Sequence, residues 1–121
     1  MFLNDLFTVL SLSSTEETIL SEIKIDASHA IFDGHFPGSP VTPGVVQLQI
    51  VKEIVEMNLQ KQLRMKTMRT CKFLQIINPL LTPVITIDIK FAYKEGFLEV
   101  TASARDEDNV YLKAQISYIV I

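Results

Sequence analysis

The segment from Pro43 to about Leu63 constrains the fold more than any other part of the chain. Read at about 100° per residue, five of its polar side chains share one stripe, and apolar side chains cover most of the remaining circumference, interrupted by Gln47 and Asn58. The stripe consists of Gln49, Lys52, Glu53, Glu56 and Gln60. Thr42 is a candidate N-cap, and Pro43 suits the first helical position. A helix with so wide an apolar arc must be wrapped on several sides by other elements.

Segments with the two-residue period of strands lie before and after this helix. Residues 15–25 alternate between apolar and polar side chains, which predicts a strand with one solvated face. Four more strands are predicted at about 68–77, 84–93, 97–105 and 110–120. Gly96 marks a tight hairpin turn, whereas residues 2–12 fit either a short helix or an edge strand. Four strands in hairpin succession imply an antiparallel sheet curled around one central helix, an α+β fold.

Composition narrows the class of protein. A chain of 121 residues fits one domain over residues 1–121, and a domain this small often completes its burial in a dimer. A formal net charge of -3 argues against nucleic acid as a partner. We expect no membrane span, since no apolar run approaches the roughly 18 residues required. The N-terminus lacks a signal-peptide pattern and the single cysteine, Cys71, fits a half-buried strand, so we expect a cytoplasmic protein.

A long loop, Asp26–Thr42, precedes the helix and contains both histidines. Loops of this length in compact domains are usually functional. Gly38 and Gly44 allow the backbone to approach a ligand, and the helix that begins near Gly44 offers free N–H groups. With His35 as a base, these groups are the two parts needed to remove a proton α to a carbonyl. His29 lacks this context and is predicted to be structural or at the surface.

The same segment resembles the signature of the β-hydroxyacyl-acyl-carrier-protein dehydratases of the hotdog fold, a family of fatty-acid chain elongation. The signature is a histidine followed by Phe-Pro-Gly, further prolines and a glycine, a short apolar stretch and an acid. The matching residues are His35, Phe36, Pro37, Gly38, Pro40, Pro43 and Gly44. The resemblance covers roughly residues 15–121 and implies the hotdog fold, in which a curved antiparallel sheet wraps one long central helix.

The resemblance also implies which residues form the site. His35 would abstract the C2 proton of a 3-hydroxyacyl thioester carried by acyl carrier protein or coenzyme A, and the Gly44 N–H would bind the thioester oxygen. The residues expected to contact substrate are Phe36, Pro37, Gly38, Pro43 and Val45. An acid on the helix of a second subunit would protonate the leaving hydroxyl, and Gln49 occupies that position. The sequence contains no phosphate-binding loop, metal-ligand cluster or dinucleotide fingerprint, so we expect no metal ion and no cofactor beyond the substrate's own pantetheine arm.

Gln49 departs from the family pattern. An amide can hydrogen-bond a hydroxyl but cannot supply a proton at neutral pH, and general-acid help is worth about 10²–10⁴ in rate. Glu53 lies one helical turn further along and is the nearby acid that could replace it. The chain is therefore interpreted as a weakened dehydratase forming a homodimer or higher oligomer. The alternatives are a catalytically silent acyl-thioester binder, a non-catalytic heterodimer partner of an active paralogue, or a thioesterase in which Gln49 positions water.

No acidic residue occurs between Glu56 and Asp88. The basic residues of this stretch are Lys61, Arg64, Lys66, Arg69 and Lys72. One interpretation is a solvated helix end, since basic residues favour a helix C-terminus. The other is a docking surface for an acidic carrier protein and its phosphopantetheine arm.

Overall fold

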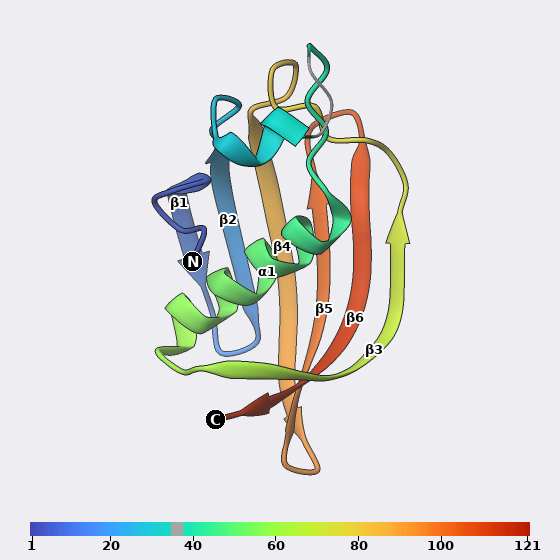
Figure 1. The fold of residues 1–121 in the computed structure, drawn as a ribbon. Helices are drawn as coiled ribbons and strands as arrows, with labels where there is room; N and C mark the ends of the chain where they lie inside the picture. The colour runs from blue at the N-terminus through green and yellow to red at the C-terminus, as the bar shows by residue number, and fades with distance from the viewer. Residues whose placement is uncertain (35–37) are drawn as a thin grey trace.

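The computed structural model describes residues 1–34 and 38–121, and its main element is a six-stranded sheet that curves around one helix (Figure 1). The elements in chain order are β1 Phe7–Ser14, β2 Thr18–Ile25, the short 3-10 helix η1 Ala30–Gly34, α1 Gly44–Leu59, β3 Leu63–Phe73, β4 Val84–Lys94, β5 Phe97–Arg105 and β6 Val110–Val120. The strand order is β1-β2-β4-β5-β6-β3, and all neighbouring strands are antiparallel. The predicted hotdog arrangement of one helix within a curved antiparallel sheet is confirmed.

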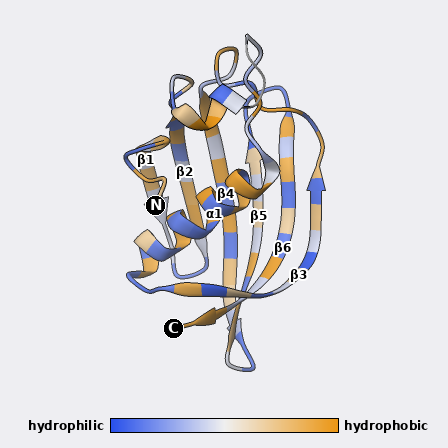
Figure 2. Ribbon diagram, in the orientation of Figure 1, coloured by the Kyte–Doolittle hydropathy of each residue, from blue (hydrophilic) through white to orange (hydrophobic). Residues whose placement is uncertain are grey.

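The core fills the space between α1 and the concave face of the sheet. Figure 2 shows hydrophobic positions alternating with hydrophilic ones along the strands. The helix contributes the buried side chains Val46, Ile50, Val51, Ile54 and Val55. These side chains occupy the wide apolar arc that the sequence predicts, and the sheet covers that arc. No helix within residues 1–34 and 38–121 is long and apolar enough to cross a membrane.

β3 is the strand that differs most from the prediction. It begins at Leu63 and ends at Phe73, and it pairs with β6 rather than forming a hairpin with β4. The hairpin succession is therefore correct only for β4, β5 and β6. Register irregularities lie between Met65 and Thr67 and between Met68 and Thr70. Each irregularity breaks the two-residue alternation, so the periodicity that identifies a strand is hidden in this one.

The helix ends earlier than predicted, at Leu59 rather than near Leu63. Gln60 adopts the left-handed conformation, with φ 56 and ψ 45, and its backbone N–H donates to the Glu56 carbonyl. The Glu56 carboxylate then accepts the backbone N–H of Leu63 at 2.8 Å. This turn lets β3 begin at once and curve around the helix from its C-terminal end to its N-terminal end (Figure 1).

The first residues of the chain lie beside α1, and residues 7–14 resolve the open alternative in favour of an edge strand, β1. Leu6 and Phe7 are buried in the core. His29 fastens this segment, because its Nε2 lies 3.0 Å from Asp5 Oδ2 and its Nδ1 accepts the backbone N–H of Ile31. Of the two predicted alternatives for His29, structural or at the surface, these bonds favour the structural one.

Candidate functional site

The loop with the dehydratase-like signature leads into the N-terminal end of α1. Three of its predicted site residues, His35, Phe36 and Pro37, lie outside the described residues. Gly38 follows them with a positive φ of 81, a backbone angle that favours glycine. Pro43 is the N-cap of the helix, with φ -60 and ψ 148, and no side chain caps it. The predicted cap, Thr42, is therefore wrong, because the chain becomes helical one residue later than expected.

Gly44 is the first residue of α1, and it packs against the aromatic ring at the end of β3. A Cβ atom on Gly44 would lie 2.6 Å from Phe73 Cζ and 2.9 Å from Cε2. At this end of α1, the backbone N–H groups of Val46 and Gln47 both donate to the Pro43 carbonyl at 3.1 Å. Within the described residues, the N–H of Gly44 has no acceptor. The close approach of Phe73 thus requires glycine at a position whose N–H is left without an acceptor by residues 1–34 and 38–121.

Gly44→Ala is expected to destabilise the fold by about 1–3 kcal/mol, because the added methyl group must displace the Phe73 ring or the helix end. Urea unfolding measures the loss. Gly34→Ala is the matched control, since a Cβ on Gly34 meets nothing within 4 Å. Adding Phe73→Leu to Gly44→Ala should recover part of the loss. An equal effect of the two single substitutions would contradict the proposed contact.

Gln47 is a site residue that the sequence interpretation did not identify. Its side chain is buried, and its Nε2 donates to the Thr42 carbonyl at 3.1 Å. The Thr42 N–H in turn donates to the carbonyl of Ile77 at 2.9 Å. These bonds fix the junction between loop and helix. The available signal was that Gln47 interrupts an otherwise apolar arc, since a buried amide needs hydrogen-bond partners.

Gln49 lies on the exposed side of α1 and lines a pocket of about 220 Å³ between the helix and β3. The other lining residues are Val45, Leu48, Lys52, Met65, Met68 and Tyr118. The structure thus brings Gln49 and Val45 together with an apolar section of β3. The Tyr118 hydroxyl is buried and has no partner within the described residues. Burial raises the pKa of Tyr118, so the phenol keeps its proton at neutral pH.

Both carboxylate oxygens of Glu53 are engaged in hydrogen bonds. Its side chain is only 7% exposed, and Oε1 accepts the backbone N–H groups of Phe2 at 2.8 Å and Leu3 at 2.9 Å. Oε2 accepts Gln49 Nε2 at 3.0 Å. Burial raises the pKa of Glu53, but the bonds from Leu3, Gln49 and Phe2 outweigh burial and lower it below its ordinary value. An ionised carboxylate holds no proton to donate, so these contacts argue against Glu53 as a replacement acid, and that role stays a prediction.

Glu53→Gln is expected to cost about 1–2 kcal/mol of stability at neutral pH, because bonds to a charged acceptor are stronger than bonds to an amide. Because the pKa of Glu53 is lower in the folded state, its ionised form stabilises the fold. This contribution to the free energy of unfolding is complete above the ordinary pKa of 4.5 and is lost as pH falls through the folded-state pKa. The difference between variant and wild type should therefore shrink below pH 4.5. Urea unfolding at several pH values measures it. The exposed Glu16→Gln is the control, and an equal acid dependence in both variants would contradict the assignment.

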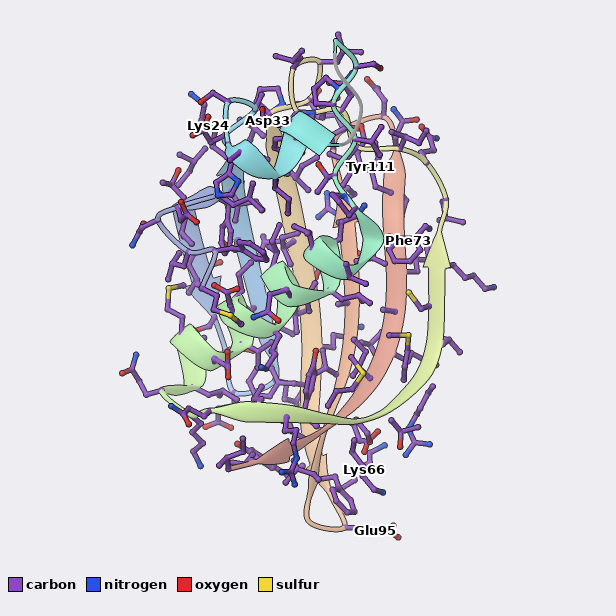
Figure 3. All side chains as sticks on the ribbon, viewed as in Figure 1. Lys24, Asp33, Lys66, Phe73, Glu95 and Tyr111 are labelled. Atoms are coloured by element: carbon purple, nitrogen blue, oxygen red, sulfur yellow. The ribbon has the colours of Figure 1, made fainter. Side chains whose placement is uncertain are left out.

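The five predicted docking cations lie between the end of α1 and the end of β3, and Lys66 and Arg69 line one hollow together. Arg69 is paired with Glu99 at 2.9 Å, and the Lys66 Nζ lies 3.8 Å from the centre of the Phe97 ring. Figure 3 shows Lys66 near Glu95, far along β3 from Phe73. Lys72 lines a neighbouring groove together with Lys90 and Lys113, and this groove shares Thr101 and Gln115 with the hollow that Lys66 and Arg69 line. Lys61 lies 5.8 Å from the Tyr93 ring centre, and Arg64 is exposed. Docking of a carrier protein stays a prediction.

The chain is similar in sequence to known dehydratases. The family model of the ApeI-like group, described as ApeI dehydratase, matches residues 11–112. The 3-hydroxyacyl-[acyl-carrier-protein] dehydratase FabZ of Lactobacillus helveticus is 24% identical over 113 residues, which cover 86% of this chain and 74% of the relative.

Solved structures share the fold at low sequence identity. The dehydratase heterocomplex ApeI:P from Xenorhabdus doucetiae contains a chain with a TM-score of 0.69 and 19% identity, covering 93% of this chain and 96% of that one. An uncharacterised protein from Erwinia carotovora subsp. atroseptica gives a TM-score of 0.60 at 22% identity, covering 94% and 92% of the two chains. A conserved protein from Pseudomonas aeruginosa gives 0.65 at 11% identity, covering 95% and 88%.

Proposed function

The chain belongs to the ApeI-like dehydratase family, and from this premise we propose that it is a dehydratase-type subunit acting on 3-hydroxyacyl thioesters of acyl carrier protein or coenzyme A. The observation that carries the proposal is the Gly44 N–H, which has no acceptor among the described residues and lies at the start of α1, directly after the signature loop and against Phe73. A free backbone donor at this point suits a thioester oxygen that gains negative charge during proton abstraction.

In the proposed reaction, His35 takes the proton from C2 of the substrate. The electrons of the C2–H bond form the C2–C3 double bond as the C3–O bond breaks, while the Gly44 N–H donates to the thioester oxygen. The leaving hydroxide must gain a proton to depart as water. In the family pattern an acid at the Gln49 position supplies this proton, and here the amide cannot. A homodimer of this chain therefore retains the base and the oxyanion donor but dehydrates slowly.

The free edge of β3 supports the proposal that the site is completed by a second hotdog chain. β3 is the last strand of the sheet, so one side of its backbone has no partner strand among the described residues. Apolar side chains on and just beyond it are exposed: Met65, Met68, Phe73, Leu74 and Ile76. An unpaired edge with exposed apolar side chains is typical of a protein interface. The same edge borders the pocket that Gln49 lines.

Met68→Lys is expected to shift the protein from dimer to monomer, because a buried unpaired lysine at an apolar interface is costly. Sedimentation or light scattering measures the mass. Leu10→Lys is the matched control, since Leu10 is 54% exposed on β1, the opposite edge of the sheet, against 39% for Met68. A wild type that stays monomeric at high concentration would overturn the homodimer. Equal dissociation in both variants would overturn the assignment to β3.

A second candidate function is a non-catalytic partner of an acid-bearing hotdog chain. The hydrogen bonds that occupy Glu53 favour this function, because they leave no available acid beside Gln49 among the described residues. In addition, a solved structure of the same fold is described as a heterocomplex. The test is to incubate purified protein with 3-hydroxyacyl carrier substrates and follow enoyl and free-thiol products. Slow enoyl formation supports the dehydratase. Thiol release would instead identify a thioesterase, and binding without either product would identify a silent binder or partner.

A further inference from the structure

The orientation of the Gln49 amide is dictated by Glu53. A side-chain amide can present either its NH₂ donors or its carbonyl acceptor to a neighbour. An ionised carboxylate only accepts hydrogen bonds, so the NH₂ group of Gln49 must face Glu53 Oε2, 3.0 Å away. The hydrogen bonds that lower the pKa of Glu53 keep that carboxylate ionised at neutral pH. The carbonyl oxygen of Gln49 therefore points away from Glu53.

The N-terminal segment holds the Glu53 carboxylate in place. Oε1 accepts the backbone N–H groups of Phe2 and Leu3 and lies 3.2 Å from the backbone nitrogen of Met1. This segment is itself fastened by the buried Leu6 and Phe7. One oxygen of Glu53 is thus committed to the backbone and the other to Gln49. The carboxylate cannot rotate away without breaking bonds that reach 50 and 51 residues along the chain.

Gln49 lines two hollows: the pocket beside β3, and a second one that it shares with Glu53 and the N-terminal segment. Because its NH₂ group is turned toward Glu53, its carbonyl oxygen is the end left for the pocket beside β3. Its Oε1 has no partner within the described residues, and the pocket walls next to it are mostly apolar, with Leu48, Met65 and Met68 among them. Lys52 also lines the pocket, but its Nζ is 3.9 Å from Glu56 Oε2. A ligand that fills this pocket displaces the water from the Gln49 carbonyl oxygen, so a ligand that brings its own donor is favoured over one that leaves the oxygen unpaired.

We infer that Glu53 is a positioning residue that sets the hydrogen-bond polarity of this pocket, so that Gln49 selects a 3-hydroxyacyl group over a 3-oxoacyl group. The inference rests on the proposed function, which places C3 of the substrate beside Gln49. A 3-hydroxyl group donates to the Gln49 carbonyl. A 3-oxo group has no proton to donate and brings its own lone pairs against that oxygen. Gln49 therefore serves to recognise the hydroxyl that it cannot protonate.

Glu53→Gln should reverse the selectivity rather than merely weaken binding. The new amide accepts Phe2 and Leu3 with its oxygen and turns its NH₂ group toward residue 49. Gln49 must then rotate to accept that group, and its own NH₂ faces the pocket. A donor in the pocket pairs with a 3-oxo oxygen, which the wild type disfavours. Gln49→Met is the second variant, because it removes the amide, leaves Glu53 with its backbone partners and abolishes any preference.

The experiment measures binding of three pantetheine probes by calorimetry: 3-hydroxybutyryl, 3-oxobutyryl and butyryl, each with an amide in place of the thioester. Wild type is expected to bind the 3-hydroxy probe about 3–10 times more tightly than the 3-oxo probe, the contribution of one neutral hydrogen bond. The ratio should fall to near one in Gln49→Met and below one in Glu53→Gln. The butyryl probe reports general damage, since its affinity involves no group at C3.

The possible outcomes separate this inference from the proposed function. If no variant binds any of the three probes, the proposed function fails. If all probes bind but the ratio is the same in wild type, Glu53→Gln and Gln49→Met, the inference fails and the proposed function stands. A loss of all binding only in Glu53→Gln, with an unchanged ratio in Gln49→Met, would also overturn the inference.

Discussion

Gln49→Glu is expected to raise the dehydration rate of the purified protein by about 10²–10⁴-fold, the usual contribution of a general acid. The reason is local: every other part of the proposed chemistry is already present, and the substitution restores a carboxyl where the family pattern has one. The rate of enoyl formation from a 3-hydroxyacyl carrier substrate measures the gain. Gln62→Glu is the control, since it makes the same change of charge at an exposed position outside the pocket between α1 and β3.

The neighbouring Glu53 should make the introduced acid effective at neutral pH. Two carboxyl groups about as close as the present 3.0 Å contact cannot both ionise easily, so the pair retains one proton. Glu53 keeps its negative charge through its bonds to Phe2 and Leu3, and the proton therefore stays on residue 49. Adding Glu53→Gln to Gln49→Glu removes that negative charge, lowers the pKa of the new acid and should move the alkaline limb of the pH–rate profile to lower pH.

Two results would contradict this account. The first is a folded Gln49→Glu protein that binds the pantetheine probes but gains no activity, because residue 49 would then lie away from the leaving group. The second is an alkaline limb that does not move when Glu53→Gln is added. That result would separate Glu53 from the acid while leaving the role of residue 49 intact.

The fold could be predicted from the sequence where burial imposes a regular period. Helix α1 is recognisable because most of its circumference is buried, and β4 and β5 alternate because one face of each is buried. In β6 the burial alternates only from Leu112 to Ile116. β3 could not be placed correctly, because two register irregularities break its alternation and it pairs with the strand most distant from it after the helix. Strand pairing over such a separation leaves no local signal.

The candidate site, like the fold, could be predicted only in part. The signature from His35 to Gly44 is contiguous, so it is visible in the sequence. Glu53 appears in the sequence only as an acid one turn from Gln49, and the prediction that it could act as a proton donor follows from that spacing. Its actual partners, Phe2 and Leu3, lie about fifty positions earlier. The donors that keep Glu53 ionised are backbone N–H groups. Such groups do not depend on the type of residue, so no sequence pattern reveals which of them bind this carboxylate.

His35→Ala in the Gln49→Glu background is expected to lower the dehydration rate by about 10²–10⁴-fold, because it removes the proposed base. The same two substitutions can test whether each site is shared between subunits. If His35 of one subunit works with residue 49 of the other, the double variant His35→Ala, Gln49→Glu is inactive as a homodimer. Its mixed dimer with wild type then contains one site with His35 and a glutamate, and one site with alanine and Gln49.

Co-expression of the two chains with different tags, followed by purification on both, isolates the mixed dimer. Its expected activity is about half that of the Gln49→Glu homodimer, since one of its two sites has both the base and the acid. The wild-type homodimer measures the activity of His35 with Gln49 alone. If base and acid instead came from the same chain, the mixed dimer would hold one wild-type site and one site lacking the base, and it would be no faster than wild type. Because both arrangements use identical residues, the difference in rate depends only on whether the site crosses the interface.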